Sequence, residues 1–223
     1  MNLDAESTHS WTENADAWIA AVRGGQIESR RAVTDGAIVA KVVACQGPRV
    51  LDVGCGEGWL ARALAARGLE VTGVDASASL VAAAHSAGGG RFLVASYEEL
   101  ARQTVPLPPS PFDVAVFNFS LLTEAVSPVL QAVRRAVRPG GRLVIQTVHP
   151  LITDPAQPYT DGWRVEDFAG MGGGFSREMP WYFRTIGSWV REVRAAGWRL
   201  ESIDEPLHPE TRRPASLLLI ART

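Results

Sequence analysis

The sequence has few of the residues that build disulfide frameworks or metal centres. Its two cysteines, Cys45 and Cys55, occur among 223 residues without a CxxC spacing, which argues against a disulfide scaffold and against a zinc site. The four histidines are scattered and show no ligand spacing. These are His9, His85, His149 and His208. We therefore expect a reduced chain without a bound metal.

An excess of basic residues and a long apolar run are also missing. The formal net charge is -2, so nothing in the composition indicates a nucleic-acid or anionic-membrane partner. No stretch approaches the roughly 20 apolar residues of a membrane span. The N-terminus lacks the basic segment and apolar run of a signal peptide. These absences predict a cytoplasmic protein.

What is present indicates one α/β domain over residues 1–223. Hydrophobic residues make up 46% of the chain, enough for a sizeable core. Short apolar strands alternate with helices from Arg49 to Val148, which predicts a mostly parallel sheet covered on both faces. The last two strands are joined by about a dozen residues, so we expect them to pair antiparallel. Expected strands lie near 49–53, 70–74, 91–94, 113–117, 143–148, 198–204 and 216–221.

Two further segments flank this pattern. Residues 1–47 form a predicted helical cap, with a capping box at Ser10 and Glu13 and a second helix over 27–45. Residues 149–184 form a predicted lid insertion without regular structure of its own, rich in proline, glycine and aromatic residues. The aromatic residues favour a packed lid. We interpret its acids as a solvated loop rather than a metal site. They are Asp154, Asp161, Glu166 and Asp167.

The strongest motif is Gly54-Cys55-Gly56-Glu57-Gly58, between the first strand of the alternation and its helix. Parallel sheets bind ligands at the carboxyl ends of their strands, and glycines let backbone N–H groups approach a ligand closely. Asp75 ends the second strand, where a carboxylate reaches ribose hydroxyls. Cys55 is interpreted as a small turn residue rather than a nucleophile, because no histidine is paired with it locally.

The spacing distinguishes between nucleotide cofactors. The nicotinamide and flavin fingerprint is G-x-G-x-x-G, but Trp59 stands where its last glycine belongs. Asp52 also lies inside an apolar strand, where a carboxylate is costly unless it is paired. An ammonium and a sulfonium give a reason for an acid here, whereas a pyrophosphate does not. The motif therefore favours S-adenosylmethionine over NAD.

Four motifs in order resemble those of class I S-adenosylmethionine-dependent methyltransferases, most closely the bacterial small-molecule branch (methyltransferase type 11/12-like). They are Val50–Gly58, Val74-Asp75, Phe112–Leu121 and Arg138–Pro150. The resemblance implies a Rossmann-like, doubly wound, three-layer αβα fold with a seven-stranded sheet and an antiparallel last strand. It also implies that S-adenosylmethionine binds at the glycine turn.

The resemblance further implies roles for individual residues. Gly54, Gly56 and Gly58 line the methionine portion and the ribose, and Asp52 lies near the amino group. Ala76 borders the adenine, as do Ser96 and Tyr97, although Ser96 stands where the family commonly has an aspartate. Asn118 and Phe119 border both cofactor and substrate. The implied cofactor set is Asp52, Gly54, Cys55, Gly56, Gly58, Asp75, Ala76, Ser96, Tyr97, Asn118, Phe119 and Trp11.

Substrate contacts are expected where the lid leaves and rejoins the fold. His149 is a candidate general base, with loop capping as an equal alternative. Tyr182 and Arg184 are candidate substrate contacts, although Arg184 has an alternative role as the ion-pair partner of an acid such as Glu178. Trp11 and Trp18 either close over the cofactor or serve ordinary helix packing.

The expected function is in-line methyl transfer to a small organic acceptor. Strand four ends in Asn118-Phe119-Ser120-Leu121, without the prolines of DNA amino-methyltransferases or the acids of metal-dependent catechol enzymes. Two alternatives remain: a non-catalytic cofactor-binding regulatory module, and a NAD-dependent oxidoreductase. The sequence does not indicate the acceptor or the oligomeric state.

Overall fold

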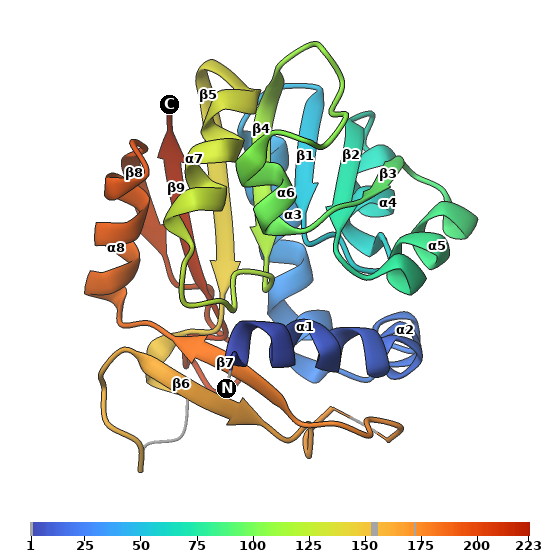
Figure 1. Ribbon diagram of the computed structural model, residues 1–223. Coiled ribbons are helices and arrows are strands. Elements are labelled where there is room, and N and C mark those ends of the chain that lie inside the picture. The colour runs from blue at the N-terminus through green and yellow to red at the C-terminus, as the bar shows by residue number, and fades with distance from the viewer. Residues whose placement is uncertain (1, 153–155, 172) are drawn as a thin grey trace.

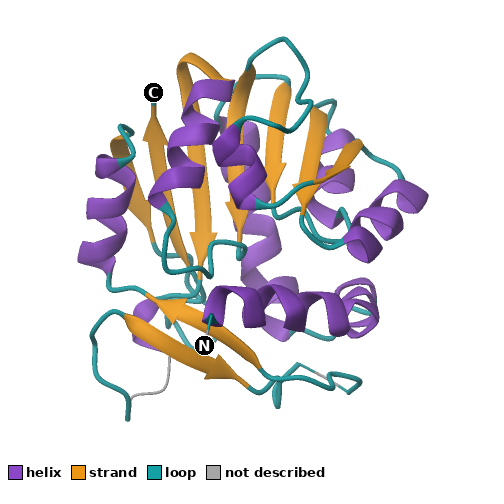
Figure 2. Ribbon diagram, viewed as in Figure 1, coloured by secondary structure: helices purple, strands orange, loops and turns teal. Residues whose placement is uncertain are grey.

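A seven-stranded sheet forms the centre of the molecule (Figures 1 and 2). The computed structural model describes residues 2–152, 156–171 and 173–223. The strand order is β3-β2-β1-β4-β5-β9-β8. The strands are β1 (Arg49–Val53), β2 (Glu70–Asp75), β3 (Arg91–Val94), β4 (Phe112–Asn118), β5 (Val137–Thr147), β8 (Arg199–Asp204) and β9 (Leu217–Arg222).

Strands β1 to β5 are parallel, and β9 runs antiparallel to both of its neighbours, β5 and β8. The expected sheet, with its antiparallel last strand, is confirmed. The order reverses beside β1, because β2 and β3 extend to one side and β4 and β5 to the other. The carboxyl ends of β1 and β4 therefore flank the switch point at which such sheets bind ligands.

Helices cover both faces of the sheet (Figure 2). One face packs against α3 (Asp35–Ala44), α4 (Trp59–Ala65) and α5 (Ala78–Ala87) through an aliphatic core. The other face packs against three further helices, with Phe117, Trp189 and Trp198 among the buried side chains. These are α6 (Tyr97–Arg102), α7 (Ser127–Ala136) and α8 (Ile186–Ala195). Burial from both sides explains why the parallel strands are nearly continuous apolar runs.

The N-terminal cap contains α1 (Leu3–Glu13) and α2 (Ala15–Arg23). The predicted capping box at Ser10 and Glu13 is wrong, because α1 begins earlier, with the Asn2 side chain accepting from the Ala5 N–H at 3.2 Å. Ser10 is instead buried within α1. The helix predicted over 27–45 is largely confirmed: it contains a π-helical turn, η1 (Arg30–Thr34), that continues into α3.

The lid segment has regular structure that the sequence analysis did not predict. β6 (Gly162–Glu166) and β7 (Met179–Phe183) pair as an antiparallel hairpin, preceded by the short helix η2 (Pro150–Ile152). Figure 1 shows this hairpin lying across the end of the main sheet, beside α1. Asp154, Pro155 and Gly172 lie outside the described residues.

The connection into β5 also differs from the prediction. The strand expected near 143–148 begins earlier, at Val137, so Pro139, Gly140 and Gly141 lie inside β5. The register of β5 against β4 shifts between Phe112 and Val114, so the strand absorbs the extra residues as an irregularity.

Candidate functional site

The glycine turn after β1 is held by backbone hydrogen bonds to the neighbouring strand. The N–H groups of Gly54 and Cys55 both donate to the Val74 carbonyl, at 2.7 and 3.0 Å. Gly54 has φ +76°, and a Cβ on it would collide with the Cβ of Ser120. Gly56 has φ +54°, and a Cβ there would meet open space. The turn therefore exposes backbone at the ligand edge of the sheet.

Gly58 has a different role from the one expected. It has φ +81° and precedes α4, and a Cβ on it would lie 2.9 Å from the Ala84 Cβ and 3.1 Å from Phe92. Gly58 does not line the cavity described below. Its requirement for glycine comes from the close packing of α4 against α5 and β3.

Asp75, at the end of β2, organises the turn as well as facing the cavity. Its Oδ2 accepts from the Gly56 N–H at 2.9 Å, and its Oδ1 accepts from the Ser77 N–H at 2.8 Å. Burial raises the pKa of this carboxyl, while the two backbone N–H groups lower it. Each carboxylate oxygen has further lone pairs for ligand hydroxyls.

Asp52 is the penultimate residue of β1 and does not line the cavity. It is 1% exposed, and its Oδ2 has no hydrogen-bond partner among the described residues. Burial, followed by the charge of Asp75, raises the pKa of Asp52 to about 7. An isolated buried carboxylate is unfavourable, so this position is suited to a nearby positive charge.

Glu57 is a site residue that the sequence analysis did not single out. Its carboxylate is 3% exposed and forms ion pairs with Arg23 of α2 and Arg62 of α4, each at 2.7 Å. Arg23 also donates to the Ala83 carbonyl at 3.2 Å. Glu57 therefore fixes the helical cap to the cofactor turn. The sequence signal for Glu57 is an acid inside a glycine turn. Its arginine partners are distant in sequence or on the next helix, so the ion pairs were not predicted.

The side chains at the end of β3 are occupied by the protein itself. Ser96 caps α6 through a capping box with Glu99, and the Tyr97 hydroxyl donates to the Ser120 carbonyl at 2.7 Å. Both residues line the cavity, as does Ala76. This end of β3 therefore offers a ligand backbone groups and the Tyr97 ring rather than a free carboxylate.

The end of β4 supplies unsatisfied polar surface to the same edge. The Asn118 Oδ1 is buried and has no hydrogen-bond partner among the described residues. Phe119 has φ +53°, an uncommon conformation for a bulky residue, and its N–H donates to the Gln146 carbonyl at 2.8 Å. Strained backbone of this kind is enriched at ligand sites.

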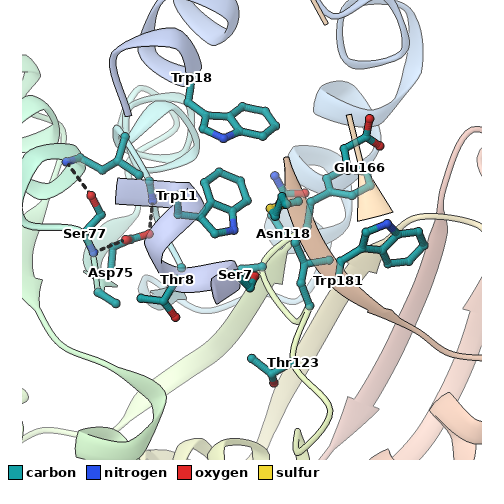
Figure 3. Close-up of a pocket in the computed structure, with 18 of the residues that line it drawn as sticks. Ser7, Thr8, Trp11, Trp18, Asp75, Ser77, Asn118, Thr123, Glu166 and Trp181 are labelled. Atoms are coloured by element: carbon teal, nitrogen blue, oxygen red, sulfur yellow. Dashed lines mark hydrogen bonds between the residues drawn. The ribbon is translucent and has the colours of Figure 1, made fainter. Parts of the chain in front are cut away.

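These residues line a cavity of about 820 Å³ that extends from the glycine turn to the lid. Trp11 and Trp18 of the cap stack on each other, with ring centroids 4.5 Å apart. Figure 3 shows Trp11 between Asp75 on one side and Glu166 and Trp181 of the lid on the other. Of the expected cofactor set, the cavity wall contains Gly54, Cys55, Gly56, Asp75, Ala76, Ser96, Tyr97, Asn118, Phe119 and Trp11.

The cap and the lid share an apolar cluster that roofs the cavity. Leu122, Phe168 and Met179 are buried in it, with Trp11, Trp18, Met171, Phe175 and Trp181 packed against them. The Phe168 and Phe175 rings stack with centroids 4.3 Å apart, and both meet the Trp18 ring edge-on. The expectation of a packed aromatic lid matches this arrangement.

His149 does not reach the cavity. Its ring is fully buried, Nδ1 accepts from the Leu151 N–H at 3.1 Å, and Nε2 lies 2.7 Å from the Glu205 carboxylate. With Nδ1 acting as an acceptor, the proton lies on Nε2 and is donated to Glu205. Both ring nitrogens are occupied, so the structure supports loop capping and not a general base.

Tyr182 and Arg184 are also absent from the cavity wall. The Arg184 guanidinium donates to the carbonyls of Thr123 and Glu124, at 2.6 and 2.5 Å, and lies over the Tyr182 ring at 4.7 Å. These contacts replace the anticipated ion pair with Glu178. Arg184 therefore fastens the lid to the loop after β4 rather than touching substrate.

Other expectations concern cysteine, metal and membrane chemistry. Cys55 is 4% exposed, and burial raises the pKa of its thiol, which keeps it protonated. Within residues 2–152, 156–171 and 173–223, no group of three His, Cys, Asp or Glu residues is arranged to hold a metal ion. In the same ranges, no helix is long and apolar enough to span a membrane.

Comparisons with known proteins bear on the motif resemblance and on the fold. A family profile described as a methyltransferase domain matches residues 51–145. A relative named ubiquinone biosynthesis O-methyltransferase, from Idiomarina loihiensis, is 34% identical over 165 residues, which is 66% of this chain and 62% of the relative. The chain thus spans less than two thirds of the length of this curated relative.

Solved structures share the fold. A putative S-adenosylmethionine-dependent methyltransferase from Listeria monocytogenes superposes with a TM-score of 0.67 at 19% identity, covering 88% of this chain and 98% of that one. One from Mesorhizobium loti gives a TM-score of 0.63 at 23% identity, covering 84% and 96%. The motif resemblance thus agrees with a methyltransferase-domain match over residues 51–145 and with the fold of solved S-adenosylmethionine-dependent methyltransferases.

Proposed function

We propose that this chain transfers a methyl group from S-adenosylmethionine to a small organic acceptor bound between the cap and the lid. One observation carries the proposal. A single cavity of about 820 Å³ joins the cofactor turn at Gly54 and Gly56 to an apolar compartment beneath Met179 and Trp181. A volume of this size is typical of sites for small molecules.

The described residues suit a cofactor with a positively charged end. Gly56 leaves room where a side chain would otherwise stand, and Asp75 offers its remaining lone pairs to ribose hydroxyls. Asp52 and the unsatisfied Asn118 Oδ1 supply negative charge and an acceptor atom behind and beside the turn. When bound, S-adenosylmethionine supplies an electrophilic methyl group, and the protein supplies alignment and exclusion of water.

The acceptor compartment favours a flat or apolar molecule that carries a nucleophilic oxygen. Trp11, Trp18 and Trp181 present aromatic surface to it, and aromatic side chains stack well on planar groups. The curated relatives named ubiquinone biosynthesis O-methyltransferase support oxygen as the methylated atom. The lack of nucleic-acid partners and the cytoplasmic location stay predictions from the sequence.

The alternative of a binding module makes a different prediction about the same cavity. A module without transferase activity needs no space beyond the cofactor, whereas the compartment beneath the lid extends the cavity past the turn. A screen with methyl-labelled S-adenosylmethionine against fractionated metabolites tests this. Label in a small-molecule product supports the proposal, and cofactor binding without any labelled product supports the module.

The nicotinamide alternative is separated by titration calorimetry. We expect S-adenosylhomocysteine to bind and NADH to show no saturable heat. Tight binding of NADH without binding of S-adenosylhomocysteine would contradict the proposal.

A further inference from the structure

The inner face of the lid hairpin carries a carboxylate toward the acceptor compartment. Cross-strand partners of an antiparallel pair point to the same side, and Glu166 pairs with Met179 while Arg164 pairs with Trp181. Met179 is 5% exposed within the apolar cluster of cap and lid, and Trp181 packs against that cluster. The intervening Val165 is 61% exposed, as expected for a side chain on the outer face. Glu166 therefore faces inward.

Among the described residues, Glu166 is held through one of its two carboxylate oxygens. Its Oε1 accepts from the Phe168 N–H at 2.9 Å, which fixes the carboxylate beside the cavity wall. No ion pair to Glu166 is formed within the described residues. The charged neighbour on the same face is Arg164, whose guanidinium lies 3.4 Å from the Phe183 ring centroid and donates to the Pro158 carbonyl. The second carboxylate oxygen remains available to a ligand.

The other ionisable groups of the described cavity wall are committed elsewhere. Glu57 pairs with two arginines, and Asp75 accepts two backbone N–H groups. The Tyr97 hydroxyl donates to a carbonyl, and burial raises the pKa of its phenol. Glu98 is largely exposed on α6, and Arg30 of η1 is held in an ion pair. None of these groups lies on the lid hairpin.

Asp4 is the remaining acid of this wall. It lies in the first turn of α1, where the helix N-terminus stabilises its negative charge, and its Oδ1 accepts from the Glu124 N–H at 3.3 Å. It thereby joins the cap to the loop after β4. Glu166 is flanked by Trp181 and Met179 instead, within the apolar compartment itself.

We infer that Glu166 is the general base that takes the proton from an acceptor hydroxyl, an assignment that rests on the proposed methyl transfer. The acceptor oxygen forms its bond to the methyl carbon while the carbon–sulfur bond breaks and leaves its electron pair on sulfur. The hydroxyl proton passes to the free oxygen of Glu166, so the product is a neutral methyl ether. This corrects two expectations: His149 is not the base, and Glu166 is not merely part of a solvated loop.

The substitution Glu166→Gln separates the ability of this side chain to accept a proton from its shape and its hydrogen bond. Glutamine keeps a carbonyl oxygen for the Phe168 N–H and keeps the shape of the side chain, but it does not accept a proton at neutral pH. The exposed Glu178 lies directly before β7, the other strand of the hairpin, and does not line the cavity, so Glu178→Gln is the matched control. Glu166→Asp retains a carboxylate and tests for partial rescue.

The assay follows labelled methyl transfer to catechol and 1-naphthol as probe acceptors. We expect kcat to fall by about 100-fold or more in Glu166→Gln, within the usual contribution of a general base, with unchanged affinity for S-adenosylhomocysteine. Glu178→Gln should behave like the wild type, and Glu166→Asp should lie between wild type and Glu166→Gln.

A second readout needs no methyl transfer. The colour of bound 4-nitrophenol reports whether its hydroxyl is ionised. The negative charge of Glu166 should keep the bound 4-nitrophenol protonated to higher pH in the wild type than in Glu166→Gln. An unchanged titration or an unchanged kcat in Glu166→Gln would overturn the assignment while leaving the proposed function intact. If the wild-type chain binds cofactor but methylates neither probe, methyl transfer to phenols is refuted as the function. The assignment of Glu166 as the general base is then refuted as well.

Discussion

The side-chain amide of Asn14 donates to the carbonyl oxygen of Arg177 at 2.7 Å, and this bond joins the helical cap to the lid. The Asn14 Oδ1 also accepts from the Ser176 N–H at 2.8 Å, so both ends of one amide hold the lid loop. Asn14 is 1% exposed and separates α1 from α2. The Arg177 guanidinium adds ion pairs to Glu6 and Glu13.

Removing this contact should loosen the roof of the cavity. Asn14→Ala leaves the Ser176 N–H without its partner and the Arg177 carbonyl with the Ser10 hydroxyl alone, and we expect a loss of about 1–3 kcal/mol in the stability of the closed lid. Hydrogen exchange of the amides in residues 173–183 measures it. Thr12→Ala, on the exposed side of α1, is the control. Equal protection of these amides from exchange in both variants would show that Asn14 does not hold the lid to the cap.

Asp75→Ala should weaken cofactor binding, because it removes the proposed ribose acceptor. We expect the affinity for S-adenosylhomocysteine to fall by about 1–3 kcal/mol, as for a lost hydrogen bond to a charged group. Asp75 also holds the Gly56 and Ser77 N–H groups, so Asp75→Asn, which keeps one acceptor oxygen, should bind better than Asp75→Ala. Calorimetry with unchanged affinity in both variants would refute the ribose assignment.

Asp52 should make both stability and affinity depend on pH. The pKa of its carboxyl is about 7 in the folded chain against an ordinary 3.8, so the folded state binds more protons than the unfolded state between these values. Stability without cofactor should therefore fall as pH rises from about 4 to 7. Asp52→Asn should relieve this loss. Without cofactor, the variant should be more stable than the wild type by on the order of 2–4 kcal/mol at pH 8, with no gain at pH 4.

The same substitution should weaken binding of the cofactor's ammonium. Wild-type affinity for S-adenosylhomocysteine should rise between about pH 6 and pH 8 as Asp52 ionises, and Asp52→Asn should lose that rise. Denaturant titrations and calorimetry at pH 4, 6 and 8 check both parts. A variant with no gain in stability at pH 8, or with wild-type affinity there, would contradict the placement of a buried charge at Asp52.

Glu57 should matter more for stability than either of its partners. Glu57→Gln removes the negative charge that pairs with two guanidinium groups, and losing one side of a buried ion pair costs about 3–5 kcal/mol. Arg23 is 44% exposed, so Arg23→Ala should cost about 1 kcal/mol or less. Thermal unfolding of the two variants tests the order. A larger loss in Arg23→Ala would show that Glu57 is not the centre of this network.

The sheet and the cofactor edge were predictable because their signals are local. Apolar strands, the glycines at 54 and 56 and the acid at 75 each depend on neighbours in sequence, and the structure places them as expected. The lid hairpin was missed because its strands have five residues each, one contains Pro180, and a long glycine-rich loop joins them. Its register is fixed by packing against the cap rather than by a turn signal.

The site residues that were wrongly predicted depend on distant partners. His149 leaves β5 at the ligand edge, but Glu205, 56 residues later, turns its ring into the fold. Arg184 is directed away from the cavity by carbonyls 60 and 61 residues earlier. Glu57 meets Arg23 across 34 residues. A single sequence carries no signal for such tertiary pairs. The inward direction of the Glu166 side chain follows only from the register of the hairpin.

The most direct measurement is transfer of a labelled methyl group into a small molecule. The chain is incubated with methyl-labelled S-adenosylmethionine and metabolite fractions, with Asp75→Ala as the binding-deficient control, and label is followed by mass spectrometry. We predict label in one or a few small-molecule products with the wild type, and strongly reduced label with Asp75→Ala. Saturable cofactor binding with all label remaining in S-adenosylmethionine would contradict methyl transfer as the function of this site.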